Sequence, residues 1–199
     1  MKRMINLTLL LLTIAILPGF AKTEQVGFEI LMKGKSIGNI KAQRIINQDK
    51  TVYKVTSKAS FRVIVKYVRE TIAEVIFSGG KIQLSDAKQI MNQQLKEHRV
   101  TEWNGATYAC KQGKSAPQAS FKKPIKLCTS MLYFQEPVGQ AFIFAENYQE
   151  LCPVELIQPG VYKVTLPQGK INHYIYKNGQ LEEIKVFRTM VNLVFKRTA

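Results

Sequence analysis

The sequence predicts an all-β protein: a strongly curved antiparallel sheet, either a half-barrel or an open-barrel meander, with a short helix or loop insertion. First, apolar and polar residues alternate along much of the chain, which is the period of a strand with one wet face. Second, turn signals recur at short intervals, with Asn-Gly and Gly-Gly pairs that supply the positive φ angles of tight hairpins. So many short strands must curl into a barrel, a half-barrel or a sandwich.

The expected strands follow one another between these turns. The clearest spans 51–65, where the odd-numbered face is mostly apolar and carries Tyr53, Val55, Phe61, Val63 and Val65. Its even-numbered face is mostly cationic, as expected on the solvent side of an antiparallel sheet. The complete set of expected strands is 26–32, 37–46, 51–65, 67–77, 81–91, 95–103, 107–111, 161–166, 170–176, 181–187 and 191–196.

Length and composition narrow the class of protein. The chain has 199 residues, 46% of them hydrophobic, which excludes intrinsic disorder and favours a single domain. A large multidomain enzyme and a polytopic membrane protein are excluded, because the chain is short and has one long apolar run.

The first 21 residues are expected to be a secretory signal peptide. Two basic residues precede an uncharged apolar run, and small residues follow up to Ala21. The run is shorter than the roughly 20 residues of a transmembrane helix, and an uncleaved N-terminal anchor is the alternative. Cleavage between Ala21 and Lys22 would leave 22–199 as a single β domain in an extracytoplasmic compartment. No cysteine follows the run, so a lipid anchor is not expected.

The segment 117–153 breaks the strand pattern. It contains Pro124, Pro137 and Pro153 and shows no clean alternation. Residues 127–134 are compatible with a short helix. We therefore expect an irregular insertion packed over or beside the sheet, in the kind of place where function tends to lie.

Sequence motifs for common chemistries are missing. The two Gly-Lys-Ser triplets lack the upstream glycine of a phosphate-binding loop, and there is no zinc-protease or nucleophile-elbow motif. The two histidines, His98 and His173, lie in expected strands among polar neighbours and are interpreted as sheet-surface residues. We expect no cofactor, no metal and no catalytic residue.

The three cysteines leave two alternatives open. In an oxidising compartment Cys128 and Cys152 could form a disulfide that constrains the insertion, with Cys110 left over. Alternatively, all three are reduced residues of the core. Glu136 and Glu146 could converge on a site, although solvated or ion-paired carboxylates are the simpler interpretation.

The net charge of +15, from 29 Lys and Arg against 14 Asp and Glu, would attract anions. Lys54, Lys58, Arg62 and Lys66 line one face of the strand at 51–65. Export argues against nucleic acid, so anionic lipid head groups or acidic envelope glycans are the partners considered. A basic surface without a specific partner is the alternative. After processing, no membrane-spanning segment is expected.

Five runs of residues resemble a family of uncharacterised secreted Gram-negative proteins, a domain of unknown function. They are FEILMKGKSIG (28–38), LYFQEP (132–137), IFAEN (143–147), YKVTLPQG (162–169) and YIYKNGQL (174–181). The resemblance implies a curved antiparallel sheet similar to the half-barrels of the lipoprotein carriers LolA and LolB, and a periplasmic location. It implies no catalytic residue.

The function expected from these observations is that of a non-catalytic periplasmic binding protein for an apolar or lipid-like ligand. A curved sheet leaves a concave apolar face, over which the insertion would act as a plug or lid. The alternatives are that the insertion fills the concavity as core, or that the protein is an envelope structural or interaction protein using its sheet edge or basic face. An enzyme is the class least supported. The residues expected at the ligand are Tyr53, Val55, Phe61, Val63, Val65, Leu132, Tyr133 and Phe134.

Overall fold

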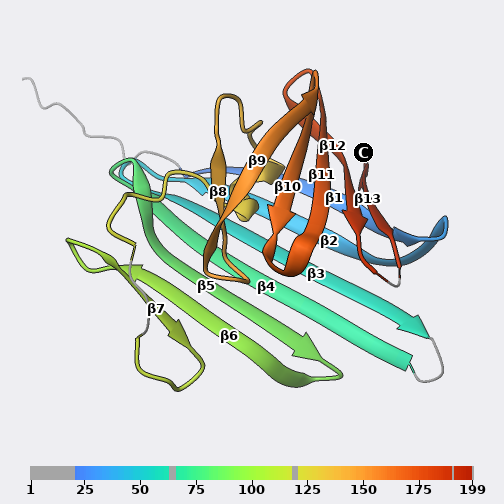
Figure 1. Ribbon diagram of the computed structural model, residues 1–199, viewed down its shortest axis with the longest axis horizontal. Helices are drawn as coiled ribbons and strands as arrows, with labels where there is room; N and C mark the ends of the chain where they lie inside the picture. Colours follow the sequence, from blue (N-terminus) through green and yellow to red (C-terminus); the bar gives the residue numbers. More distant parts are fainter. Residues whose placement is uncertain (1–20, 63–65, 118–120, 190, 199) are drawn as a thin grey trace, which may run out of the picture.

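The computed structural model describes residues 21–62, 66–117, 121–189 and 191–198. Thirteen antiparallel strands form one curved sheet that does not close, in the order β7-β6-β5-β4-β3-β2-β1-β13-β12-β11-β10-β9-β8 (Figure 1). The predicted fold class is therefore confirmed. The strands are β1 Lys22–Met32, β2 Lys35–Ile46, β3 Thr51–Arg62, β4 Lys66–Ser78, β5 Lys81–Met91, β6 Gln94–Trp103, β7 Tyr108–Gln112, β8 Phe142–Ala145, β9 Glu150–Gln158, β10 Val161–Leu166, β11 Lys170–Lys177, β12 Gln180–Phe187 and β13 Leu193–Thr198.

The sheet consists of two meanders joined through the first and last strands. Within β1 to β7, and again within β8 to β13, each strand pairs with its neighbours in sequence, and β1 also pairs with β13, with Ile30 opposite Phe195. The two edges, β7 and β8, are consecutive in sequence and are linked by the segment 113–141. In Figure 1 the long strands β2 to β6 form one wall, β9 to β12 stand across it, and a short helix lies between them.

That helix is the 3-10 helix η1, Thr129–Tyr133, within the region where a short helix was predicted. The segment 117–153 is less irregular than expected, because it also contains β8 and the first residues of β9. The sequence pattern did not indicate β9, because a proline such as Pro153 is not expected inside a strand. Pro153 lies opposite Phe142, the first residue of the edge strand, so its missing N–H falls where the ladder ends.

A second short helix, η2 (Pro167–Gly169), connects β10 to β11. In the described part of the chain, no helix is both long enough and apolar enough to cross a membrane. The predicted signal peptide lies outside the described residues except for Ala21. The predicted strand at 51–65 corresponds to β3 up to Arg62, and positions 63–65 also lie outside the described residues.

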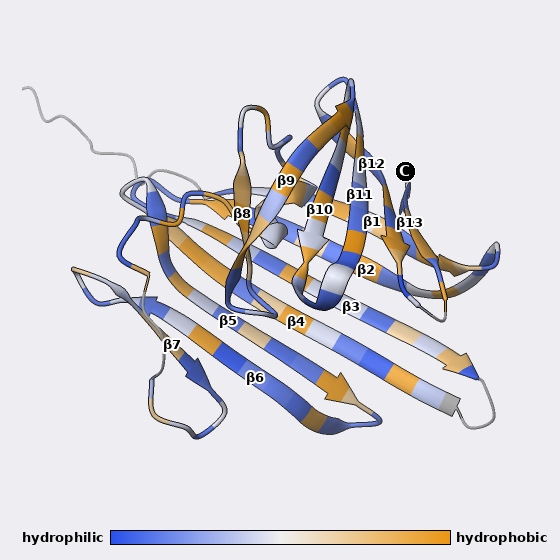
Figure 2. Ribbon diagram, in the orientation of Figure 1, coloured by the Kyte–Doolittle hydropathy of each residue, from blue (hydrophilic) through white to orange (hydrophobic). Residues whose placement is uncertain are grey.

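The core lies on the concave face of the sheet, between the two walls. The alternation predicted from the sequence is visible as bands of apolar and polar colour along the strands (Figure 2). Buried tyrosines tie the connecting segment to the walls through their hydroxyl groups. Tyr176 in β11 donates to the carbonyl of Leu132 in η1 at 2.7 Å, and the hydroxyl of Tyr108 in β7 accepts the backbone N–H of Ile125 at 3.2 Å.

The convex face is polar and partly ion-paired. On β3 and β4 the lysines of the expected cationic face meet carboxylates, with Lys54 Nζ 3.0 Å from Glu74 Oε2 and Lys58 Nζ 2.7 Å from Glu70 Oε1. Such exposed pairs contribute about 0–1 kcal/mol each. Their main effect is to neutralise part of the positive charge on this face.

Candidate functional site

A cavity of about 440 Å³ lies between the two walls of the sheet, beside η1. Its residues come from both walls because strand residues of one parity all point to the concave face. Part of the lining is hydrocarbon. These apolar residues include Ile30, Met32, Ile37, Val55, Ala59, Phe61, Val191, Leu193 and Phe195.

Three of the residues expected at the ligand line this cavity, namely Val55, Phe61 and Tyr133. Tyr53 and Leu132 are instead buried in the core beside it. Phe134 packs on Tyr53, with 6.0 Å between the ring centroids. The remaining two expected residues, at positions 63 and 65, lie outside the described residues.

Helix η1 fills one part of the concavity and leaves the rest empty. Leu132 is fully buried, and the ring of Tyr133 meets that of Phe28 edge-on with centroids 5.4 Å apart. The helix is held by Glu146, whose carboxylate accepts the backbone N–H groups of Thr129 at 3.1 Å and Ser130 at 2.8 Å, and the Thr129 hydroxyl. This segment therefore acts as a fixed plug beside the cavity.

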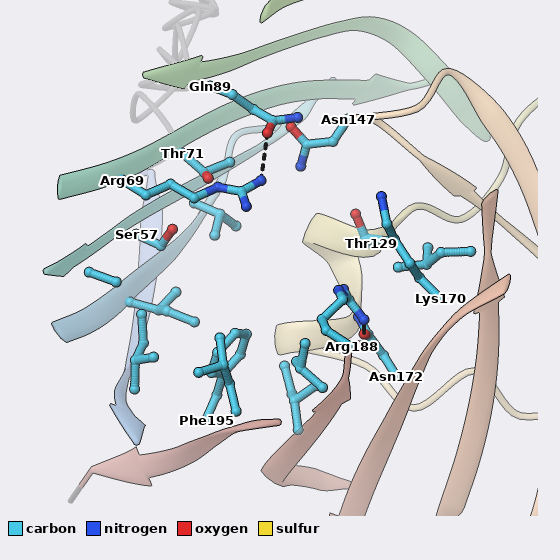
Figure 3. A pocket seen from close by; sticks show the side chains of 18 of the residues that line it. Ser57, Arg69, Thr71, Gln89, Thr129, Asn147, Lys170, Asn172, Arg188 and Phe195 are labelled. Carbon is cyan, nitrogen blue, oxygen red and sulfur yellow. Dashed lines mark hydrogen bonds between the residues drawn. The ribbon is translucent and has the colours of Figure 1, made fainter. Parts of the chain in front are cut away.

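Polar groups gather at one end of the cavity, as Figure 3 shows. Arg69 from β4 donates to the Gln89 Oε1 of β5 at 2.6 Å, and Asn147 lies beside them. Lys170 at the start of β11 and Arg188 just after β12 face this group from the other wall. Phe195 lies toward the opposite end, so the cavity is amphipathic.

Sequence reasoning missed this polar end. One signal was available in β4. Its inward-facing positions are Val75, Ala73, Thr71 and Arg69, so they change from apolar to charged toward the start of the strand. An arginine at an inward position near a strand end should have marked the mouth of the concavity.

Burial lowers the pKa of Arg188, and the nearby positive charge of Arg69 adds to this effect. The Arg188 guanidinium donates to the carbonyl of Ile171 at 3.2 Å and to Asn172 Oδ1 at 3.1 Å. Lys170 places its Nζ 5.3 Å from the ring centroid of Tyr148, in a cation–π contact. All of these partners are uncharged.

The two histidines and the two glutamates singled out in the sequence have separate partners. His98 Nε2 lies 3.1 Å from Asp86 Oδ1, and the ring of His173 packs edge-on against Phe187. Glu136 accepts a hydrogen bond from the Tyr162 hydroxyl, whereas Glu146 holds η1, so the two carboxylates do not share a function. Within the described ranges, no cluster of His, Cys, Asp and Glu could hold a metal ion.

The three cysteines are buried free thiols, and no disulfide joins Cys128 to Cys152 in the structure. Burial is the largest cause that raises the pKa of each thiol, to about 11 for Cys152. The nearby carboxylate of Glu146 raises the pKa of Cys128 further. These groups are thiols rather than thiolates at neutral pH, which is the form of a small apolar core residue.

Fold and cavity together define an open, β-barrel-like protein that encloses an amphipathic cavity. The chain belongs to the family described as a domain of unknown function, DUF6134, whose model matches residues 28–198. The sequence therefore placed the chain correctly in a family of unknown function. The similarity to LolA and LolB, and export, stay predictions.

The chain is also similar to a solved structure, the β-barrel-like protein of the domain of unknown function DUF1849 from Brucella abortus. The TM-score is 0.57 at 12% sequence identity, and the match covers 87% of this chain and 94% of that one. At this identity the likeness supports the fold alone. None of the curated proteins matches the sequence.

Proposed function

We propose that the protein is an exported, non-catalytic binding protein for an apolar or lipid-like ligand. The observation that carries this proposal is the cavity of about 440 Å³ that remains between the walls although η1 already fills part of the concavity. Ligand sites for small molecules typically measure about 300–1,000 Å³ and are mostly apolar. The size and the lining of this space match that class.

The cost of such a cavity supports the same conclusion. Protein interiors are close-packed, and voids larger than a water molecule are few. Each apolar wall that lacks a packing partner loses dispersion contacts, so an empty cavity destabilises the fold. A ligand that fills the space would recover these contacts.

Export is supported by the place where the sheet begins. β1 begins at Lys22, the residue that follows the predicted cleavage site, and it pairs along its length with β2. Cleavage after Ala21 would therefore leave the whole of β1 in the mature protein.

A cavity-filling substitution tests the proposal. Ser57 points into the cavity from β3, and its neighbour Thr56 is exposed on the opposite face. We expect the neutral apolar dye N-phenyl-1-naphthylamine to bind the unmodified protein saturably and with one-to-one stoichiometry. Ser57→Phe should weaken binding about tenfold or more, and the matched control Thr56→Phe should leave it unchanged. Absence of saturable binding to the unmodified protein, or equal loss in both variants, would contradict the proposal.

A second candidate function, an interaction protein of the cell envelope, is favoured by one observation. The edge strand β8 carries an exposed apolar side chain, Phe142, and Val138 just before it is 67% exposed. An open edge with apolar side chains can pair with a strand of another protein. Cross-linking in cells from a site on this edge would test the second candidate function. A partner that cross-links to the unmodified protein should no longer cross-link to the Phe142→Asp variant.

A further inference from the structure

We propose that the ligand of this cavity is a single-chain amphiphile with an anionic head group, bound with its head at Arg69, Lys170 and Arg188 and its hydrocarbon chain at the apolar end. This inference rests on the proposed function and names the class of ligand. Figure 3 shows Arg69 and Lys170 on the side of Gln89 and Asn147, Arg188 lower on the wall formed by β11 and β12, and Phe195 toward the opposite end.

The first argument is the sign of the charge. Three cationic side chains line the cavity, and its described lining contains no aspartate or glutamate. The three cations also come from opposite walls, with Arg69 on β4 and the other two at the ends of β11 and β12. Like charges that face each other repel, and an anion placed between them would remove that repulsion.

The second argument is that these cations lack anionic partners. Elsewhere several lysines on the convex face form ion pairs with carboxylates, among them Lys54, Lys58 and Lys163. Among the described residues, none of the three cavity cations takes part in an ion pair, and their partners are amide oxygens, carbonyls and the ring of Tyr148. Guanidinium groups are suited to binding a carboxylate or phosphate through two hydrogen bonds.

The third argument is an unsatisfied buried group at the same end. Asn147 lines the cavity beside Arg69 and Gln89, and its Oδ1 is buried without a hydrogen-bond partner. Buried polar atoms in folded proteins are almost always hydrogen-bonded. Rotation of the Asn147 amide would turn this oxygen toward the cavity, where a hydroxyl group of the ligand, such as that of a phosphate monoester or a glycerol backbone, would satisfy it.

The apolar end completes the assignment. Met32, Ile37, Leu193 and Phe195, on β1, β2 and β13, offer only hydrocarbon, sulfur and aromatic surface. A free phosphate or carboxylate would leave this surface uncovered, whereas an acyl chain attached to the anion would bury it. An amphiphile would therefore match both ends of the cavity, with its anionic head group at the cations and its acyl chain on the apolar surface.

Three lipids of one chain length, together with inorganic phosphate, test the inference by isothermal titration. Palmitate and 1-palmitoyl lysophosphatidate should bind the unmodified protein, and methyl palmitate, which lacks the charge, should bind about tenfold or more weakly. Inorganic phosphate should not bind at the same concentration. If the two lipids differ, the tighter one identifies the head group as carboxylate or phosphate.

Two variants then locate the head group. Arg69→Gln removes the positive charge of an exposed side chain and keeps an N–H donor. It should weaken the binding of palmitate about tenfold and leave the binding of methyl palmitate unchanged. Arg62→Gln, which removes an exposed charge at the end of β3, is the matched control and should change neither. Arg188→Gln is the second variant, checked by thermal unfolding because Arg188 also holds backbone carbonyls.

The outcomes separate the two proposals. If palmitate and methyl palmitate bind equally and Arg69→Gln weakens neither, the head-group inference is wrong and the apolar-ligand function stands. If none of the lipids binds and N-phenyl-1-naphthylamine does not bind either, the proposed function itself is wrong. If inorganic phosphate binds as tightly as palmitate, the site is an anion site without a chain, and the amphiphile is excluded.

Discussion

The carboxylate of Glu146 holds η1 in the concavity by accepting the backbone N–H of Ser130 at 2.8 Å. Glu146 follows the edge strand β8 directly and is only 1% exposed. The same carboxylate accepts the N–H and the hydroxyl of Thr129, so both of its oxygen atoms are used. A buried carboxylate is retained only where such hydrogen bonds replace its lost hydration.

Replacing this carboxylate should loosen the helix. In Glu146→Gln an amide N–H2 group would face backbone N–H donors, and the charged hydrogen bonds would be lost. We expect a loss of about 1.5–3 kcal/mol in the free energy of unfolding, measured by urea denaturation. The matched control is Glu155→Gln, whose side chain is 60% exposed in an ion pair with Lys163 and should cost about 0–1 kcal/mol. Equal effects of the two substitutions would contradict the structural role of Glu146.

A second prediction concerns Gly38, where β2 runs against β3. A Cβ added to Gly38 would overlap the carbonyl oxygen of Lys58 and lie 2.7 Å from the Cα of Ala59, so backbone would have to move. We expect Gly38→Ala to cost about 1–3 kcal/mol, as overpacking does. In the control Gly27→Ala the new Cβ would meet only the hydroxyl end of Thr198, which can rotate away. A Gly38→Ala protein as stable as the control in thermal unfolding would refute the close approach.

The cysteines provide a third prediction. Because Cys110, Cys128 and Cys152 are buried and burial raises the pKa of each, native protein at pH 8 should not react with Ellman's reagent. In guanidinium chloride all 3 thiols should react. A count of one thiol in the denatured protein, recovering to three after reduction, would reveal a disulfide and overturn the prediction.

Stability at alkaline pH provides the fourth prediction. The Tyr162 hydroxyl donates to Glu136 Oε1 at 2.8 Å, and burial, together with this carboxylate, raises the pKa of Tyr162 to about 12. An unfolded tyrosine titrates near about 10, so the native state binds more protons between these values and loses stability as the pH rises. This tyrosine alone should account for about 1 kcal/mol between pH 9 and about pH 11.

The check compares the unmodified protein with Tyr162→Phe in urea denaturation at several values in that range. The stability difference between the two proteins should shrink as the pH rises, because only the unmodified protein carries this titrating group. A difference that stays constant from pH 9 to about pH 11 would show that the Tyr162 pKa is not raised.

Much of the sheet could be predicted because apolar and polar residues alternate along a strand that has one buried face. The alternation in 51–62 identified the inward face, including Val55 and Phe61. The strands β8 and β9 were not predicted. β8 is too short to show an alternating pattern, and Pro153 interrupts the pattern of β9. The residues 127–134 revealed a helix but not the carboxylate that holds it, since Glu146 is distant in sequence.

By itself, the sequence determined the fold class, the family of unknown function and the inward apolar face, because each depends on the order of neighbouring residues along a strand. The tertiary structure decided which walls face each other. Pairing of β1 with β13 brings Arg69 to one end of the cavity opposite Lys170 and Arg188. Residues about 100 positions apart leave no joint pattern in a single sequence, since their proximity arises only when the whole sheet bends around η1.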